Sequence, residues 1–209
     1  MTKRVLCFGD SNTWGYNPHT QERYDEQTRW TRVLARSLGP EYEIIEEGLN
    51  GRTTVWDDPI EGFKNGYSYL IPCLESHCPL DLVVILLGTN DLKMRFSVSA
   101  SDIAASAGVL VSVVQQSLAG RDGKTPPVLL MAPPPLAKLS DHAEMFEGGE
   151  AKSIKLGARY QAVAQELGCA FLDTAEVIAS SPLDGIHWEA SEHAKLGQAL
   201  AVIIKKILD

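Results

Sequence analysis

The sequence lacks any long hydrophobic run. No stretch approaches the 18 or more apolar residues that a transmembrane helix requires, so we expect no membrane partner. The basic pair Lys3 and Arg4 precedes only a short apolar stretch, and Asp10 follows it closely. That stretch is too short for the hydrophobic region of a signal peptide. We therefore expect a cytoplasmic protein.

Positive charge is also scarce. Nineteen Lys and Arg residues stand against 27 Asp and Glu residues, which gives a net charge of -8. An acidic chain repels phosphate backbones, so we expect no nucleic-acid partner. The sequence has neither a Gly-x-Gly-x-x-Gly pattern nor a phosphate-binding loop, and this argues against a flavodoxin-like nucleotide binder.

Cysteine is rare, with four residues in 209 and no Cys-x-x-Cys pair. We predict no disulfide framework, and we expect no histidine to accompany a cysteine as a zinc ligand would. The acidic pair Asp57 and Asp58 has no third ligand beside it, so it does not predict a metal site. The sequence thus leads us to expect neither a metal nor an organic cofactor.

What the chain does contain is typical of one globular domain spanning residues 1–209, with 44% hydrophobic and 22% charged residues. Short apolar runs alternate with segments of helical periodicity. The predicted strands are Val5–Phe8, Tyr42–Ile45, Leu80–Leu87, Val128–Ala132 and Ala170–Leu172. The predicted helices are Glu26–Leu38, Tyr67–Glu75 (with Pro72 kinking or delaying it), Ser101–Leu118, Ile154–Leu167 and Ser191–Ile207.

Five strand–helix repeats predict a three-layer α/β/α sandwich with a five-stranded parallel sheet. The run Leu80–Leu87 is apolar on both faces apart from Asp81, as a covered parallel strand must be. Functional sites of such sheets form at the carboxyl ends of the strands. Four polar loops, which follow predicted strands in distant parts of the chain, should therefore meet at one edge.

Two of these loops carry a candidate nucleophile and base. Ser11 follows the first strand, and a serine hydroxyl needs an adjacent base before it attacks. His187 is the best candidate base, and Asp184 lies three residues before it, where its carboxylate can orient the imidazole. The alternatives are that Ser11 only caps a helix and that Asp184 and Gly185 only form a turn.

The remaining loops supply hydrogen-bond donors. Candidates for an oxyanion hole are the backbone N–H groups of Ser11 and Gly51 and the side-chain amide of Asn90. Glycine at position 51 allows the main chain to approach a ligand closely. The alternatives here are an ordinary turn at residues 48–51 and a capped loop at residues 88–91.

Four short blocks together resemble the signature of the SGNH/GDSL hydrolase family, in the family's order. They are GDSNTWG (9–15), GLNGRTT (48–54), GTND (88–91) and DGIHW (184–188). The resemblance implies a flavodoxin-like strand order 2-1-3-4-5 and a catalytic triad of Ser11, His187 and Asp184. It also implies that Gly51 and Asn90 complete the oxyanion hole with the Ser11 N–H.

Longer strings around these blocks look like the bacterial arylesterase and acyltransferase branch. That resemblance implies hydrolysis of short-chain aryl or alkyl esters, acyl transfer to alcohols, and assembly into a homo-oligomer. Asn12 departs from the apolar residue that this branch often carries after its serine. The expected substrate-binding residues, with core packing as the alternative for the two tryptophans, are Asn12, Trp14, Trp188, Met145 and Phe146.

Other functions stay open on the sequence. The same fold serves carbohydrate O-deacetylases and lysophospholipases or thioesterases, which rates on sugar acetates and long acyl chains would distinguish. A non-catalytic binding module with a vestigial site is a further alternative. It is disfavoured because every expected motif position is filled.

Overall fold

The computed structural model describes residues 2–208. It contains one five-stranded parallel sheet in the order β2-β1-β3-β4-β5, which confirms the predicted fold class and strand order. The strands are β1 Lys3–Gly9, β2 Tyr42–Gly48, β3 Leu82–Leu86, β4 Val128–Ala132 and β5 Ala170–Asp173. Two of the three inner strands, β3 and β4, are buried at every residue, because helices cover both faces of the sheet.

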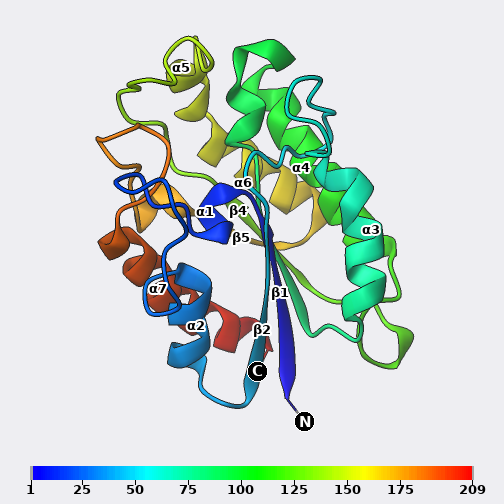
Figure 1. Ribbon diagram of the computed structural model, residues 1–209. Coiled ribbons are helices and arrows are strands. Elements are labelled where there is room, and N and C mark those ends of the chain that lie inside the picture. The colour runs from blue at the N-terminus through cyan, green and yellow to red at the C-terminus, as the bar shows by residue number, and fades with distance from the viewer. Residues whose placement is uncertain (1, 209) are drawn as a thin grey trace.

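Helices form the two outer layers (Figure 1). One layer consists of α2 and α7, and the other of α3, α4 and α6. The bounds are α1 Ser11–Trp14, α2 Trp30–Leu38, α3 Gly66–His77, α4 Ala100–Gln116, α5 Gly149–Ser153, α6 Leu156–Leu167 and α7 Ala190–Leu208. Among the described residues, none of these helices is both long enough and apolar enough to cross a bilayer.

Each layer encloses its own hydrophobic core. Leu6, Phe8 and Ile85 point into the core beneath α3, α4 and α6. Their neighbours Cys7 and Val84 point into the opposite core beneath α2 and α7. This alternation follows from the two-residue period of a strand. On α7, Leu196, Leu200 and Ile204 are fully buried, and Ile203 and Ile207 pack at the margin of the same core.

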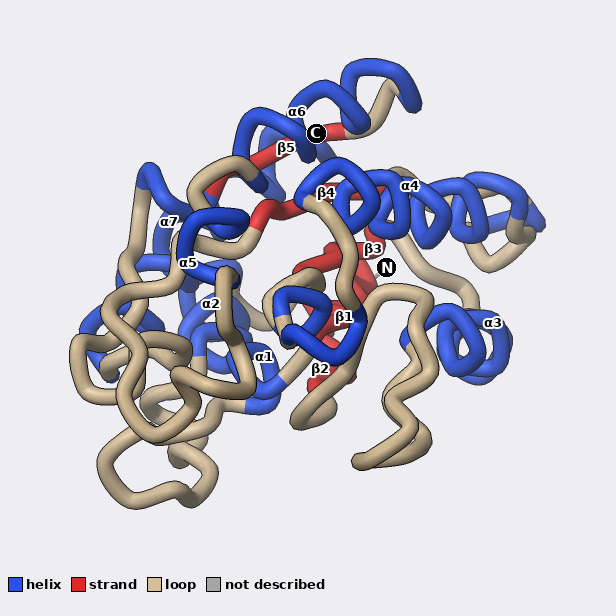
Figure 2. Tube along the Cα trace, turned by 90° about the horizontal axis from the view of Figure 1, so that it is seen from above, coloured by secondary structure: helices blue, strands red, loops and turns tan. Residues whose placement is uncertain are grey.

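All five strands point the same way, so their carboxyl ends share one edge of the sheet. Figure 2 looks down on that edge, where loops and the short helices α1 and α5 gather. The loops after β1, β2 and β3 and the loop before α7 therefore come within reach of one another. The sheet in this way brings together segments that are far apart in sequence.

Two helical predictions need correction. The helix predicted from Glu26 begins only at Trp30, because Asp25 forms a side-chain-stabilised turn with Gln27 and Thr28, and Arg29 has an extended backbone. Pro72 lies inside α3 and does not delay that helix, which runs through it to His77.

The tightest contact between helices generates a prediction. A Cβ at Gly197 of α7 would lie 2.7 Å from the Trp30 carbonyl oxygen and 2.7 Å from Val33 Cβ. The usual gain from replacing a helical glycine by alanine is at most about 1 kcal/mol. Overpacking costs about 1–3 kcal/mol, so Gly197→Ala should lower the free energy of unfolding. The measurement is chemical denaturation of both proteins.

The matched control is Val202→Ala on the same helix, whose side chain is 57% exposed. It should change the unfolding free energy by less than about 0.5 kcal/mol. A Gly197→Ala protein as stable as the parent would contradict the packing described for α2 and α7.

Candidate active site

Ser11 is the first residue of α1, and only Asp10 separates it from the end of β1. The Asp10 carboxylate caps this short helix by accepting a 2.9 Å hydrogen bond from the Asn12 backbone N–H. The sequence alternative of a helix cap therefore applies to Asp10 and not to Ser11. Ser11 is only 6% exposed and lines a pocket at the carboxyl edge of the sheet.

His187 lies against Ser11, 176 residues away in sequence. The distance from Ser11 Oγ to His187 Nε2 is 2.9 Å, and that from His187 Nδ1 to Asp184 Oδ2 is 2.7 Å. A carboxylate can only accept, so the Nδ1 proton lies between these two residues and Nε2 is left to accept the serine proton. The three side chains form a continuous hydrogen-bonded chain.

The Asp184 carboxylate is held in place by its own loop. Its Oδ1 accepts the backbone N–H groups of Ile186 at 2.8 Å and His187 at 2.9 Å. Burial by itself raises the pKa of Asp184, but the hydrogen bonds from His187 and from these amides outweigh it, and the pKa lies below its usual value. The carboxylate is therefore ionised at neutral pH and stabilises a positive charge on the imidazole.

Tyr16 is a neighbour of the base that sequence reasoning missed. Its ring centroid lies 4.0 Å from that of His187, with the planes tilted by 30°. The Tyr16 backbone N–H also donates to the Ser11 carbonyl at 2.9 Å. The only signal in the sequence is that Tyr16 lies just past the first block. That position does not predict a contact with His187.

Gly51 and Asn90 lie on the same pocket as Ser11. Gly51 has a φ of +80°, a backbone conformation that favours glycine. One N–H of the Asn90 amide donates to the Arg52 carbonyl at 3.1 Å. An asparagine amide has two N–H groups, so this contact fixes the side chain and leaves a second donor for a ligand.

Arg52 anchors the loop that carries Gly51. Its guanidinium is buried, donates to the carbonyls of Gly9 (2.8 Å) and Glu47, and lies 4.2 Å from the Phe8 ring centroid. These contacts join the ends of β1 and β2.

Two fully buried carboxylates underlie the site. Burial, together with the nearby charge of Asp91, raises the pKa of Asp10 to about 7, against the opposing effects of the Asn12 amide, Arg52 and Thr89. Burial likewise raises the pKa of Asp91 to about 6, although its carboxylate accepts hydrogen bonds from the backbone and hydroxyl of Thr54.

The pocket at Ser11 has a volume of about 190 Å³. That is below the roughly 300–1,000 Å³ of pockets that bind drug-sized ligands, so it fits a small group. Two of the expected substrate-binding residues, Met145 and Phe146, line it. Lining residues that sequence analysis did not single out are Tyr16, Asn50, Glu61, Lys93, His142 and Ile186.

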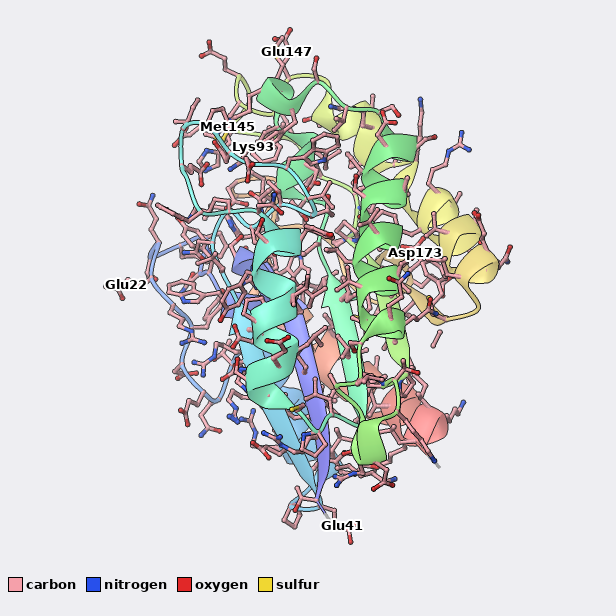
Figure 3. All side chains as sticks on the ribbon, turned by 90° about the vertical axis from the view of Figure 1, so that its right-hand side faces the viewer. Glu22, Glu41, Lys93, Met145, Glu147 and Asp173 are labelled. Atoms are coloured by element: carbon pink, nitrogen blue, oxygen red, sulfur yellow. The ribbon has the colours of Figure 1, made fainter. Side chains whose placement is uncertain are left out.

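One wall of the pocket carries a buried cation. Lys93 is 3% exposed, and its ammonium group pairs with Glu61 and lies 3.9 Å from the Asp58 carboxylate. Figure 3 shows Lys93 and Met145 close together at the same end of the molecule. The pocket therefore has both an apolar and a charged wall.

Three expected substrate-binding residues lie elsewhere. Trp188 is wholly buried in the core beneath α2 and α7, with its ring 5.4 Å from that of His193. Asn12 is 2% exposed, and its amide contacts the Ile186 carbonyl at 3.4 Å, so it links the two catalytic loops. Trp14 packs against Arg23, whose guanidinium carbon lies 5.4 Å from the centroid of the Trp14 ring. The pocket lining contains none of the three.

An α/β sandwich with a serine, a histidine and an aspartate hydrogen-bonded at the carboxyl edge of its sheet defines a class of protein, the serine hydrolases. Residues 7–194 match the model of the GDSL-like Lipase/Acylhydrolase family. The chain belongs to this family, and it is a serine esterase, a carboxylic ester hydrolase.

Solved structures support this assignment. The native aryl esterase of M. smegmatis is 45% identical, with a TM-score of 0.95 over 99% of this chain and 100% of that chain. Est24, a carbohydrate acetylesterase from Sinorhizobium meliloti, is 42% identical, with the same TM-score and coverage. A lipolytic protein of the G-D-S-L family from Veillonella parvula, at 12% identity and a TM-score of 0.70, shares the fold. Among curated proteins, none matches the chain.

The buried Asp10 generates a prediction about pH. Its pKa of about 7 in the folded protein lies above the unfolded value of about 3.9, so the folded state holds the proton more tightly. Ionisation of the buried Asp10 lowers the free energy of unfolding. This loss is absent below about pH 4, where Asp10 is protonated in both states, and it is complete above about pH 7. Asp10→Asn, which keeps the helix cap, should therefore gain stability relative to the parent as the pH rises through this interval. Chemical denaturation at several pH values measures it, and a difference that stays constant from pH 4 to 7 would refute the assignment.

Proposed function

We propose that the protein hydrolyses short-chain acyl esters of aryl and alkyl alcohols through an acyl intermediate on Ser11. The observation that carries this proposal is the 2.9 Å contact between Ser11 Oγ and His187 Nε2 at the mouth of a pocket of about 190 Å³. A hydroxyl hydrogen-bonded to an oriented imidazole is an activated nucleophile. The small pocket favours acetyl and other short acyl groups.

The reaction has two steps. Ser11 Oγ attacks the ester carbonyl carbon while His187 Nε2 takes the serine proton, and the tetrahedral oxyanion accepts hydrogen bonds from Ser11 N–H, Gly51 N–H and Asn90. The C–O bond to the alcohol then breaks, and His187 returns the proton to the leaving oxygen. Water attacks the acyl-serine by the same route, which releases the carboxylic acid and restores Ser11.

Side chains and backbone N–H groups of this protein suffice for every step, so the proposed reaction needs neither a metal nor an organic cofactor. An alcohol in place of water would take the acyl group from Ser11 and form a new ester. The resemblance to the arylesterase and acyltransferase branch leads us to propose three further properties. They are acyl transfer to alcohols, assembly into a homo-oligomer and a cytoplasmic location.

Removal of the acetyl group from a carbohydrate is the second candidate function. It is favoured by the similarity to carbohydrate acetylesterases and by the polar wall of the pocket, where Asn50, Glu61 and Lys93 can hydrogen-bond to hydroxyl groups. Comparison of rates on a sugar acetate and on an aryl acetate decides between the two.

The central variant is Ser11→Ala. It should lower kcat/KM for an aryl acetate by at least about 10³-fold, because loss of the nucleophile leaves only binding and the oxyanion hole. The matched control is Ser180→Ala, since the Ser180 hydroxyl donates to the Pro135 carbonyl and takes no part in the site. Circular dichroism should show both variants folded. Activity of Ser11→Ala within tenfold of the parent would overturn the proposal.

The pocket size sets the acyl preference. We expect kcat/KM for p-nitrophenyl esters to fall steadily from acetyl to octanoyl, because the longer chains exceed the pocket. Met145→Ala, which shortens a lining side chain, should raise the octanoyl rate relative to the acetyl rate several-fold. Met94→Ala, a change at an exposed methionine outside the lining, should leave that ratio unchanged. An octanoyl ester preferred by the parent protein would refute the assigned acyl pocket.

A further inference from the structure

Three potential metal ligands converge on the α3 side of the sheet. They are Glu47 near the end of β2 and Cys73 and His77 on α3. The carboxylate oxygen, the thiol sulfur and the imidazole nitrogen all lie within 4.8 Å of one another. Figure 3 is viewed from this side, with α3 in front of the strands. Sequence analysis expected no histidine to accompany a cysteine as a zinc ligand, and this expectation is wrong.

The backbone gives this cluster a defined geometry. Cys73 and His77 are four residues apart on one helix, a spacing that places two side chains on one face and recurs in zinc sites built on helices. Glu47 reaches the same point from the strand, where His77 Nε2 lies 2.8 Å from its Oε1 and the Tyr69 hydroxyl donates to its Oε2 at 3.2 Å. The carboxylate is thus held in place by two side chains of α3.

The chemistry of the three donors fits a borderline divalent metal. Sulfur, nitrogen and oxygen donors together are typical ligands of Zn²⁺ and are poorly suited to Mg²⁺ or Ca²⁺. Bonds of 2.0–2.3 Å in a tetrahedron put ligand atoms roughly 3.5 Å apart. Atoms already within 4.8 Å can reach this spacing by side-chain rotation.

Access also fits. Cys73 is 1% exposed, whereas the side chains of His77 and Glu47 are 29% and 19% exposed, so an ion enters from the histidine side. His77 and Glu47 already form an ion pair with each other at this point.

We propose that Glu47, Cys73 and His77 form a binding site for Zn²⁺ or a related divalent metal such as Co²⁺, with water completing the tetrahedron. The reaction at Ser11 does not use this site. The proposed metal site nevertheless lies beside the oxyanion loop, and Arg52 connects the two. The Arg52 guanidinium donates to the carbonyls of Glu47 and Gly9, and the Arg52 carbonyl accepts a hydrogen bond from the Asn90 amide.

Cobalt titration of the chelator-treated, full-length protein tests the proposal. Co²⁺ should bind with one equivalent, produce a thiolate-to-cobalt charge-transfer band, and be displaced by Zn²⁺. Cys73→Ala should abolish the band, and His77→Gln and Glu47→Gln should each weaken Co²⁺ binding at least about tenfold. Zn²⁺ should raise the Tm of the parent by more than it raises that of His77→Gln.

The matched controls are two cysteines outside the cluster that are more exposed than Cys73. Cys78 is exposed and adjacent to His77, and Cys169 is partly exposed; Cys78→Ser and Cys169→Ser should keep the band and its affinity. Loss of the band in Cys78→Ser would overturn the proposal, as would its absence in the parent protein. Because Cys73 lies in the core, the partly exposed His77→Gln decides the matter if Cys73→Ala fails to fold. Unchanged affinity in His77→Gln would also contradict the site.

Discussion

The active site depends on one hydrogen bond, between Ser11 Oγ and His187 Nε2, which joins two residues 176 positions apart. No local sequence preference brings them together. The parallel sheet does so, because its strands end at one edge and the loops after β1 and before α7 meet there. Asp184 fixes the imidazole from its own loop, and the buried Arg52 fixes the ends of β1 and β2. The site is therefore as rigid as the sheet beneath it.

The fold was largely predictable because its signals are repeated. Five apolar runs alternating with helical periodicity leave few arrangements other than a covered parallel sheet, and errors at single boundaries do not alter this. The late start of α2 is such an error. Arg29 follows a turn stabilised by Asp25, and its guanidinium pairs with Glu46 from β2. The periodicity of apolar residues in a segment does not show that one of its residues contacts a strand later in the chain, so it cannot predict where α2 begins.

The candidate site was predictable where a motif supplied several residues at once. It was not predictable where the direction of a single side chain determines whether a residue reaches the pocket. His187 faces Ser11 while its neighbour Trp188 is buried in the opposite direction. The sequence placed both in one loop but did not give their orientations. Tyr16 and Lys93 were missed for the same reason, because each lies just past a recognised block and the sequence did not show that its side chain reaches the pocket. Core packing was the alternative weighed for Trp188, and it is the one that the structure has.

The most direct test of the central claim is labelling with a fluorophosphonate followed by peptide mapping. The probe reports a serine that an adjacent base has activated, independently of which ester the protein prefers. The account predicts one adduct per chain, on the peptide that contains Ser11, and greatly slowed labelling when His187 is replaced by alanine. An adduct on a different serine, or an active esterase whose Ser11 stays unlabelled, would contradict it.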